Sequence, residues 1–356
     1  MTADSQIREA PSNMPSRIAL PDVPALFVNA RQAFLMTNEG ELLTLSHQEA
    51  AQEIDNKAVM VCHAPYTKRR LGFEAFYAFD VLELFAFAHP TRFCVPTPHG
   101  LSSALHIHAP SEFEDYPLAL MNIAKTLLKD LQHDALKDKA DPKNIAGVMG
   151  LRGKGWNWTP FIYEALGDTY ETEQIINSRR ALNVWKHLPE WADDAPMPPP
   201  SHYGVSEAEA HERLAELLTV GDKPAEIREP QKEYSASIAQ IFTPMREDEN
   251  PHIVLAEAGT GVGKTLGYLA PASVWAEKNE GAVWVSTYTK NLQRQIDGEL
   301  DRLYPHPQVK DAYVSVRKGR ENYLCLLNLE DLSGGAEAAY TPRHAIAAGI
   351  MARWAA

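Results

Sequence analysis

The chain has 356 residues, of which 45% are hydrophobic and 23% charged, and its formal net charge is −13. This composition is typical of a globular protein with room for two or three domains. It argues against a membrane protein, because no apolar run approaches the roughly 18 residues that a spanning helix needs. The acidic balance also argues against a protein that coats nucleic acid non-specifically, although a local basic groove is still compatible with it.

Cysteine usage and the N-terminus indicate the compartment. The three cysteines, Cys62, Cys94 and Cys325, are too few and too scattered for a disulfide framework. The first residues lack the apolar segment of a secretory signal. We therefore expect a cytoplasmic protein.

Composition divides the chain into four stretches. Residues 1–22 are predicted to be a disordered leader, and 23–135 a small α/β domain. Residues 136–225 are predicted to form a helical connector, which includes the proline-rich sequence "DDAPMPPPSHYG". Residues 226–356 are predicted to be the first part of a nucleotide-binding lobe.

In the first half of the chain, apolar runs alternate with helical patterns. Strands are predicted at 25–30, 33–37 and 57–65, and helices at 45–54, 79–90, 111–136 and 175–191. Trp156 and Trp158 could stack on bases, but core packing is the favoured role.

The second half shows helix–strand alternation. A capping box, Ser206 with Glu209, opens a predicted helix at 206–221. Further helices are predicted at 237–242, 264–278, 290–304 and 344–356, and strands at 252–258 and 282–287. Strands that alternate with helices in this way indicate a parallel sheet with crossover helices.

A phosphate-binding loop is predicted between the strand at 252–258 and the helix that follows. Its residues are Ala258, Gly259, Thr260, Gly261, Val262, Gly263, Lys264 and Thr265. Glycines let successive N–H groups face an anion, and the following helix adds its positive end. Lys264 is predicted to reach the β- and γ-phosphates, and the Thr265 hydroxyl to ligate Mg²⁺. A glycine-rich turn could match by chance, but the strand before it and the helix after it favour the phosphate loop.

Two flanking segments bear on the class of nucleotide enzyme. The Gln231 amide could pair with the N6 and N7 edge of adenine, although an ordinary surface glutamine at a helix start fits the sequence equally well. Downstream, Ser286 and Thr287 end a predicted strand, where small hydroxyls can hold nucleic-acid phosphates. The alternative is a solvated strand end. Of the basic runs in the chain, 316–320 is favoured as a phosphate contact because of its context.

Taken together, these segments resemble motifs of DinG-type DNA helicases, the XPD-like branch of superfamily two. The matching sequences are "REPQKEY", "EAGTGVGKTLGYLAP", "VSTYTKNLQRQI" and "RKGRENYLC", and the resemblance covers about Arg228 to Leu332. It implies a RecA-like parallel sheet and ATP-dependent unwinding of DNA. It also implies ATP and Mg²⁺ bound at Lys264 and Thr265, with Gln231 as the adenine reader.

The same resemblance assigns further roles. It places Thr287, Thr289 and Gln293 near the DNA backbone. Cys325 matches the first of four cysteines that hold a [4Fe–4S] cluster in many members, but no cysteine follows it here. On residue type alone, a lone cysteine is more often buried filler.

Some parts of a helicase are not found in this sequence. After Thr265, no apolar strand ends in the Asp-Glu pair that would hold Mg²⁺ and orient water. A second motor lobe and its arginine finger are also not found. We expect the chain to be the N-terminal part of a longer enzyme, to bind ATP weakly or not at all, and not to unwind DNA alone.

The first domain contains, in order, "VCHAPYTKRRLG", "AFDVLELFAFAHP", "HGLSSALHI" and "EDYPLALMNIAKTLL". By the order of these segments, residues 25–131 resemble a DnaQ-like 3′–5′ exonuclease, and the resemblance implies an RNase H-like domain. That chemistry needs several carboxylates around two metals. The first strand should offer Asp-x-Glu but has Asn29-Ala30-Arg31, which leaves Asp80 and Asp115. We expect a degenerate, non-catalytic domain in which substitution of Asp80 leaves function unchanged. An unrelated small α/β domain is the alternative.

Two other functions stay open at this point. The chain could be a nucleotide kinase or switch ATPase unrelated to DNA, or a non-enzymatic adaptor whose first domain recruits replication or repair proteins. Gln231 together with Ser286 and Thr287 favours the helicase, because a kinase has no need of that pairing.

Overall fold

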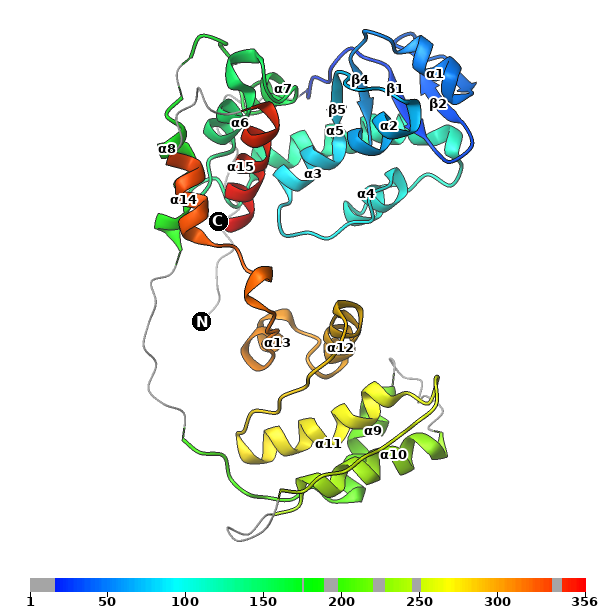
Figure 1. Ribbon diagram of the computed structural model, residues 1–356, viewed down its shortest axis with the longest axis vertical. Helices are drawn as coiled ribbons and strands as arrows, with labels where there is room; N and C mark the ends of the chain where they lie inside the picture. Colours follow the sequence, from blue (N-terminus) through cyan, green and yellow to red (C-terminus); the bar gives the residue numbers. More distant parts are fainter. Residues whose placement is uncertain (1–16, 175, 189–197, 220–227, 245–250, 335–340) are drawn as a thin grey trace. The chain divides into compact units, whose positions relative to one another are not determined.

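The computed structural model describes residues 17–174, 176–188, 198–219, 228–244, 251–334 and 341–356. The chain forms two compact units (Figure 1). Unit 1 comprises Met1–Trp191 and Leu324–Ala356, and unit 2 comprises Ala192–Tyr323. In sequence, unit 2 is therefore an insertion within unit 1, and residues 136–191 of the predicted connector belong to unit 1.

Unit 1 is built on a five-stranded mixed sheet. Its strands are β1 (Ala25–Val28), β2 (Ala33–Met36), β3 (Leu42–Leu45), β4 (Val59–Val61) and β5 (Ala78–Asp80). The spatial order is β3-β2-β1-β4-β5. The first three strands form an antiparallel meander, whereas β4 and β5 run parallel to β1. The predicted α/β class is thereby confirmed for this unit.

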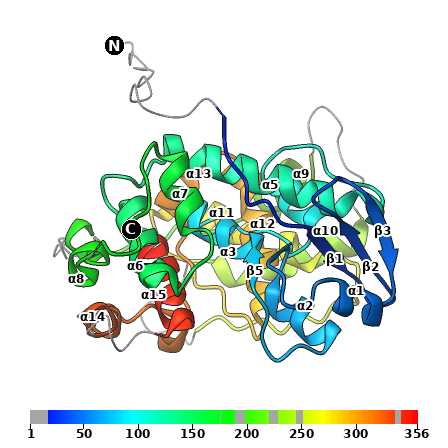
Figure 2. The same ribbon diagram turned by 90° about the horizontal axis from the view of Figure 1, so that it is seen from above.

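Helices cover both faces of this sheet, as Figure 2 shows. Helices α1 (His47–Glu53) and α2 (Ala64–Leu71) pack on the face that carries Leu26 and Val28. Helix α5 (Tyr116–Asp130) packs on the opposite face, against Ala25 and Met60. Neighbouring residues of β1 thus point to opposite sides, as the pleat requires.

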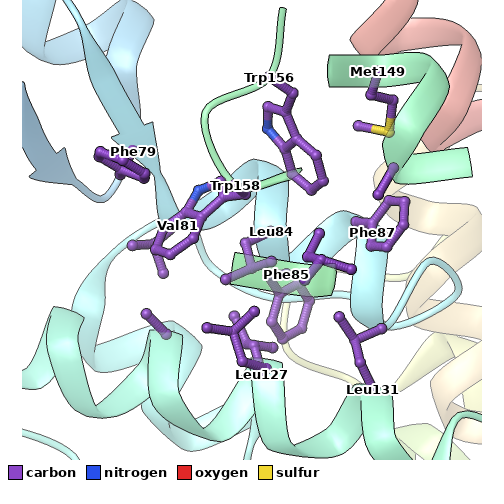
Figure 3. Close-up of a cluster of buried hydrophobic side chains, with 14 of the residues drawn as sticks. Phe79, Val81, Leu84, Phe85, Phe87, Leu127, Leu131, Met149, Trp156 and Trp158 are labelled. Carbon is purple, nitrogen blue, oxygen red and sulfur yellow. The ribbon is translucent and has the colours of Figure 1, made fainter. Parts of the chain in front are cut away.

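The largest core of unit 1 lies on the α5 side of the sheet (Figure 3). The rest of the helices in this unit are α3 (Val81–Ala88), α4 (Pro98–Ala104), α6 (Pro142–Gly150), α7 (Thr159–Ala165), α8 (Ser178–Ala181), α14 (Leu326–Gly334) and α15 (Pro342–Ala355). Trp156 and Trp158 are both buried in this core. The Trp158 indole N–H donates to the Asp80 carbonyl oxygen at 2.8 Å, so both tryptophans are structural here.

The C-terminal helix α15 packs against α3 and α6 in unit 1. Its Arg353 is fully buried and forms an ion pair with Asp134 at 2.7 Å. The same guanidinium donates to the carbonyl oxygens of Phe87 and Ala140, at 3.0 and 2.7 Å. This helix, predicted from the pattern at 344–356, is thus part of the core of unit 1.

The described residues of unit 2 are helical or without regular structure. The helices are α9 (Glu207–Leu218), α10 (Glu229–Ala239), α11 (Lys264–Asn279), α12 (Lys290–Leu303) and α13 (Pro307–Tyr313). Ser206 and Glu209 form the predicted capping box at the start of α9. Helices α9, α10 and α11 pack on one another through small apolar clusters that include Ala210, Leu214 and Ala270.

The predicted parallel sheet of unit 2 is absent from the described residues. The segments 252–258 and 282–287 contain no strand, and most of their apolar side chains are exposed, with Leu255 at 96% and Trp284 at 81%. A strand is stabilised by hydrogen bonds to a neighbouring strand. Among the described residues, neither segment pairs with a neighbouring strand, so β propensity alone does not make either of them a strand.

Other differences are local. The 175–191 pattern gives only α8 and a short 3₁₀ turn at Val184–His187, and its residues 175 and 189–191 lie outside the described residues. Ile18, which the sequence places in a disordered leader, is buried in the core of unit 1, whereas leader residues 1–16 lie outside the description. Among the described residues, no helix is long and apolar enough to cross a bilayer.

Candidate nucleotide-binding site

The predicted phosphate loop leads directly into α11, a helix of 16 residues. Gly261 and Gly263 both have φ of +85°, a left-handed backbone that a side chain would strain. A Cβ at Gly263 would also collide with the amide of Gln231, whereas at Gly261 it would meet open space. The loop is therefore tightly packed at its helix end and open near its middle.

The start of α11 is suited to an anion. Its N-cap residue, Gly263, has no side chain and so gives no acceptor to the first-turn N–H groups. Such N–H groups, together with the helix dipole, favour a negative group at this end. The local sequence therefore supplies donors without a competing side-chain cap.

Lys264 closes the loop on itself. Its ammonium donates to the carbonyl oxygens of Ala258 at 2.7 Å and Gly259 at 3.0 Å. These are neutral acceptors, which a charged phosphate oxygen can replace with a stronger, charge-assisted bond. The ammonium is thus held at the loop by neutral carbonyl groups, and within the described ranges it forms no ion pair.

Helix α10 supports the loop from outside. The Gln231 side-chain amide donates to the Gly263 carbonyl oxygen at 3.0 Å, and Gln231 is only 3% exposed. The Arg228 guanidinium donates to the Gly261 carbonyl oxygen at 3.1 Å. Gln231 is therefore not a surface residue: it lies against the loop, while its reading of adenine stays a prediction.

Thr265 shares a side-chain hydrogen bond with Tyr268 one turn later. Burial raises the pKa of the Tyr268 phenol above its ordinary value, so this group stays protonated at neutral pH. The Thr265 hydroxyl is consequently fixed beside Lys264 at the loop end of α11. That position suits the predicted contact with Mg²⁺.

The residues present fit a triphosphate with Mg²⁺. They offer a cation at Lys264, a hydroxyl at Thr265, first-turn N–H groups, and open space beside Gly259 and Gly261. The chemistry of each donor matches a phosphate oxygen or a hard metal ion.

The residues predicted to lie near DNA are grouped at the start of α12. Thr289 caps this helix by accepting from the Leu292 N–H at 3.2 Å. The Thr287 hydroxyl donates to the Thr289 carbonyl oxygen at 3.0 Å. Gln293, on the first turn, donates to the Arg317 carbonyl oxygen at 3.0 Å, which brings the predicted basic run 316–320 to this helix end.

In unit 1, the Asp80 carboxylate caps a helix. Its Oδ1 accepts from the N–H groups of Leu82 and Glu83 at 2.9 and 3.1 Å, and its Oδ2 from that of Ala64 at 2.7 Å. Burial raises the pKa of this carboxyl group, and the three backbone bonds oppose that rise. Both oxygens of Asp80 therefore have structural partners, and we expect its removal to destabilise unit 1. This replaces the expectation that Asp80 is dispensable.

Glu83 is a second acid at this helix start, partly buried, to which sequence analysis assigns no role. Burial, and then the charge of Asp80, raise its pKa to about 7, while a hydrogen bond from Trp156 lowers it. The Trp156 indole donates to Glu83 Oε2 at 2.9 Å. The only local sequence signal that pointed to Glu83 was its position three residues after Asp80, which is the spacing of a capping box at a helix start.

The other residues of the predicted nuclease site do not gather around Asp80 as ligands. Asn29 forms a turn in which its Oδ1 accepts from the N–H groups of Arg31 and Gln32, at 2.8 and 2.9 Å. Asp115 is exposed just before α5. Within the described residues, no three His, Cys, Asp or Glu side chains form a group that could hold a metal.

The cysteines present do not fit a [4Fe–4S] cluster. Cys325 is exposed, Cys62 is buried and Cys94 is partly buried. The chain has three cysteines, one fewer than a Cys₄ site requires.

Curated proteins share parts of this sequence. The chain is 33% identical over 130 residues to the 3′-5′ exonuclease DinG of Bacillus subtilis (strain 168), an alignment that covers 35% of this chain. It is 39% identical over 103 residues, or 28% of the chain, to the ATP-dependent helicase DinG of Mycobacterium tuberculosis (strain ATCC 25618 / H37Rv). It is 42% identical over 124 residues, or 32% of the chain, to the ATP-dependent DNA helicase YoaA of Escherichia coli (strain K12).

Over about a third of its length, the chain is similar in sequence to DinG-type helicases. The resemblance predicted from the motifs is thereby confirmed. The aligned part spans only 12%, 15% and 16% of the length of these three DinG-type relatives. The chain matches no family model and no solved structure.

Proposed function

We propose that this chain is the nucleotide-binding, N-terminal portion of an ATP-dependent DNA helicase of the DinG type. The observation that carries the proposal is the loop at 258–265, where two left-handed glycines precede α11 and Lys264. The names of the relatives support ATP as the nucleotide and DNA as the partner. Unwinding requires parts of such an enzyme that the sequence of this chain does not supply.

The chain's own residues would bind the nucleotide in a simple exchange. The Lys264 ammonium leaves the carbonyl oxygens of Ala258 and Gly259 for the β- and γ-phosphates. The loop N–H groups would hold the remaining phosphate oxygens, and the Thr265 hydroxyl would be a ligand of Mg²⁺. ATP supplies the bond whose cleavage would power movement on DNA. Gln231 and Arg228 keep the loop carbonyl groups in place during this exchange.

We propose further that unit 1 is a degenerate nuclease domain of RNase H-like type. Its strand order, β3-β2-β1-β4-β5 with an antiparallel meander followed by two parallel strands, supports this assignment. The Bacillus relative carries an exonuclease name. Here, however, the Asp80 oxygens have backbone partners and Arg31 stands near the end of the first strand, where a cation opposes metal binding.

Nucleotide binding tests the first proposal. The full chain should bind a fluorescent ATP analogue weakly in the presence of Mg²⁺, and Lys264→Ala should remove that binding. Lys278→Gln is the matched control, because Lys278 lies at the far end of α11, where it contacts Glu209 and Gly204. Equal binding by wild type and Lys264→Ala, or robust strand separation by the chain alone, would contradict the proposal.

Incubation with labelled single-stranded DNA and Mg²⁺ or Mn²⁺ tests the proposal for unit 1. We expect no degradation. Metal-dependent degradation that Asp80→Asn abolishes, in a variant whose circular dichroism matches wild type, would show an active nuclease instead.

A further inference from the structure

Four aromatic rings gather on the α5 face of the sheet in unit 1. Phe27 in β1 and Phe34 in β2 are cross-strand neighbours, and their rings stack with centroids 6.5 Å apart. Phe113, in the 3₁₀ turn before α5, stacks or tilts against both rings, with centroids at 5.8 and 6.0 Å. The Tyr116 ring lies 4.5 Å from that of Phe27. The group therefore joins the first two strands to the start of α5.

This aromatic group is anchored at one side and exposed at the other. Phe34 is buried, at 1%, whereas Phe113 is 47% exposed. In β3, Thr44 pairs with Phe34 and Leu42 pairs with Met36, so Leu42 is a diagonal neighbour of Phe34 on the same face. Leu42 is 44% exposed. We call the apolar surface that results the aromatic patch, and it comprises Phe27, Leu42, Phe113 and Tyr116.

The segments that carry the aromatic patch are acidic. Residues 38–44 and 111–116 hold five carboxylates and no lysine or arginine. All five are exposed and, within the part of the chain that the structure describes, form no ion pair: Glu39, Glu41, Glu112, Glu114 and Asp115. An apolar centre with a charged rim is the usual anatomy of a protein interface, in which aromatic residues supply much of the affinity. This rim suits a basic partner, and it repels nucleic acid and a second copy of a chain with net charge −13.

The aromatic patch also borders an edge of the sheet. Strand β3 is outermost, and among the described residues it pairs only with β2. Its sequence, Leu42–Leu45, contains none of the lysines or prolines that often protect such edges. An extended segment can add to an edge of this kind through main-chain hydrogen bonds, while its alternate side chains contact the face of the sheet.

We propose that the aromatic patch docks an extended, basic segment of a partner protein. An apolar side chain of that segment lies against Phe113 and Leu42, and lysine or arginine side chains on either side of it meet the acidic rim. The apolar contact supplies most of the affinity, and the charges set the rate and orientation of binding. The inference goes beyond the proposed function, because it concerns unit 1 and requires neither nucleotide nor DNA.

Fluorescence anisotropy of the full chain with short labelled peptides tests the proposal. The probe has two leucines separated by threonine, with lysines at both ends, so that both leucines lie on one side of the extended peptide. In one control peptide glutamate replaces the lysines, and in the other serine replaces the leucines. Wild type should bind the probe about tenfold or more tightly than either control peptide, because each control lacks one of the two contacts.

Variants of the aromatic patch locate the binding. Phe113→Ala should weaken binding of the probe by about 5- to 30-fold with the salt dependence of wild type, because an aromatic anchor is lost and no charge is. Phe113→Leu should keep most of the affinity, since an apolar side chain remains. Glu114→Gln should weaken binding by about 1.5- to 5-fold and reduce its salt dependence. Both side chains are exposed, so far-UV circular dichroism of these variants should match wild type.

Tyr77→Ala is the matched control for loss of an exposed ring. Tyr77 is 70% exposed just before β5, at the opposite edge of the sheet from β3, and its variant should bind the probe as wild type does. Wild-type affinity in Phe113→Ala would overturn the proposal. So would equal binding of the lysine and glutamate peptides, or no binding of the probe by wild type.

Sedimentation equilibrium separates a partner protein from a second copy of the chain. We expect a monomer, because two acidic rims repel each other. A wild-type dimer that Phe113→Ala dissociates would assign the aromatic patch to self-association and overturn the proposal. Binding of the ATP analogue is a separate measurement, so its failure would refute the nucleotide site and leave the result for the aromatic patch standing.

Discussion

The two units of this chain use their side chains differently. Unit 1 buries an apolar core on both faces of its sheet and holds a fully buried arginine, Arg353. Unit 2 joins its helices with partly exposed ion pairs, such as Arg213 with Glu277 at 2.7 Å, and no residue of α12 is buried. The residues proposed to bind the nucleotide are in unit 2. Packing is thus concentrated in one unit and the proposed nucleotide chemistry in the other.

The largest test of this comparison is the Arg353 ion pair. Arg353→Met should lower the free energy of unfolding by about 3–5 kcal/mol, because Asp134 would remain buried without its cation. Urea unfolding followed by far-UV circular dichroism measures the change. The double variant Arg353→Met/Asp134→Leu should recover part of the loss, since no unpaired charge remains.

Arg213→Met is the matched control in unit 2. Arg213 pairs with Glu216 and Glu277, whose side chains are largely exposed. Solvent screening limits such pairs to about 1 kcal/mol or less. Equal losses for the two arginine variants would show that the units do not differ in the way described.

The same substitution at two leucines sharpens the comparison. Leu26, in β1, is fully buried, whereas Leu255, before the phosphate loop, is 96% exposed. Leu26→Ala should cost about 2–5 kcal/mol in the free energy of unfolding, and Leu255→Ala less than about 0.5 kcal/mol. Urea unfolding of both variants gives the values. A large loss for Leu255→Ala would mean that residues 252–258 are packed in solution.

How far the sequence predicts the structure also differs between the units. Strands β1, β2 and β4 were predictable because each is a short apolar run bounded by turn residues. Strand β3 is half exposed and β5 has three residues that run into α3, so neither has a clear pattern. The helices of unit 2 were predictable because their signals are local, as in the Ser206 capping box. The parallel sheet predicted for unit 2 is absent from the described residues, because strand pairing depends on residues distant in sequence and not on local pattern alone.

In the candidate site too, local sequence signals were readable, whereas contacts between residues distant in sequence were not. The phosphate loop is a contiguous motif, so its glycines and Lys264 were identifiable from spacing alone. The contact of Gln231 with Gly263 spans 32 residues and that of Trp156 with Glu83 spans 73. No periodic pattern in the sequence indicates such contacts. They emerge only once the chain is folded. The bond from the Ala64 N–H to the Asp80 carboxylate, which helps to change the expected role of Asp80, is of the same kind.

The smallest expected effect concerns pH and the partly buried acid Glu83. Its pKa is raised to about 7 by burial and by Asp80, so folding favours its protonated form. Between about pH 4.5 and about pH 7, the folded state keeps a proton on Glu83 that the unfolded state releases. The free energy of unfolding therefore falls as pH rises through this range. Glu83 alone can change the free energy of unfolding by at most about 1.4 kcal/mol per pH unit. Glu83→Gln should remove that slope, as urea unfolding at pH 5 and pH 8 would measure.

Glu209→Gln in unit 2 is the control with the opposite sign. The Glu209 pKa is lowered to about 2 by Lys278 and Ser206, so its contribution is present at neutral pH and is lost only as pH falls through the acid range. Glu209 is exposed, and solvent screening keeps its effect small. Between pH 5 and pH 8, Glu209→Gln should therefore leave the pH dependence of wild type unchanged. If Glu83→Gln also follows wild type across that window, then the Glu83 carboxylate is hydrated in solution, and the core of unit 1 is more open around Trp156 than the structure indicates.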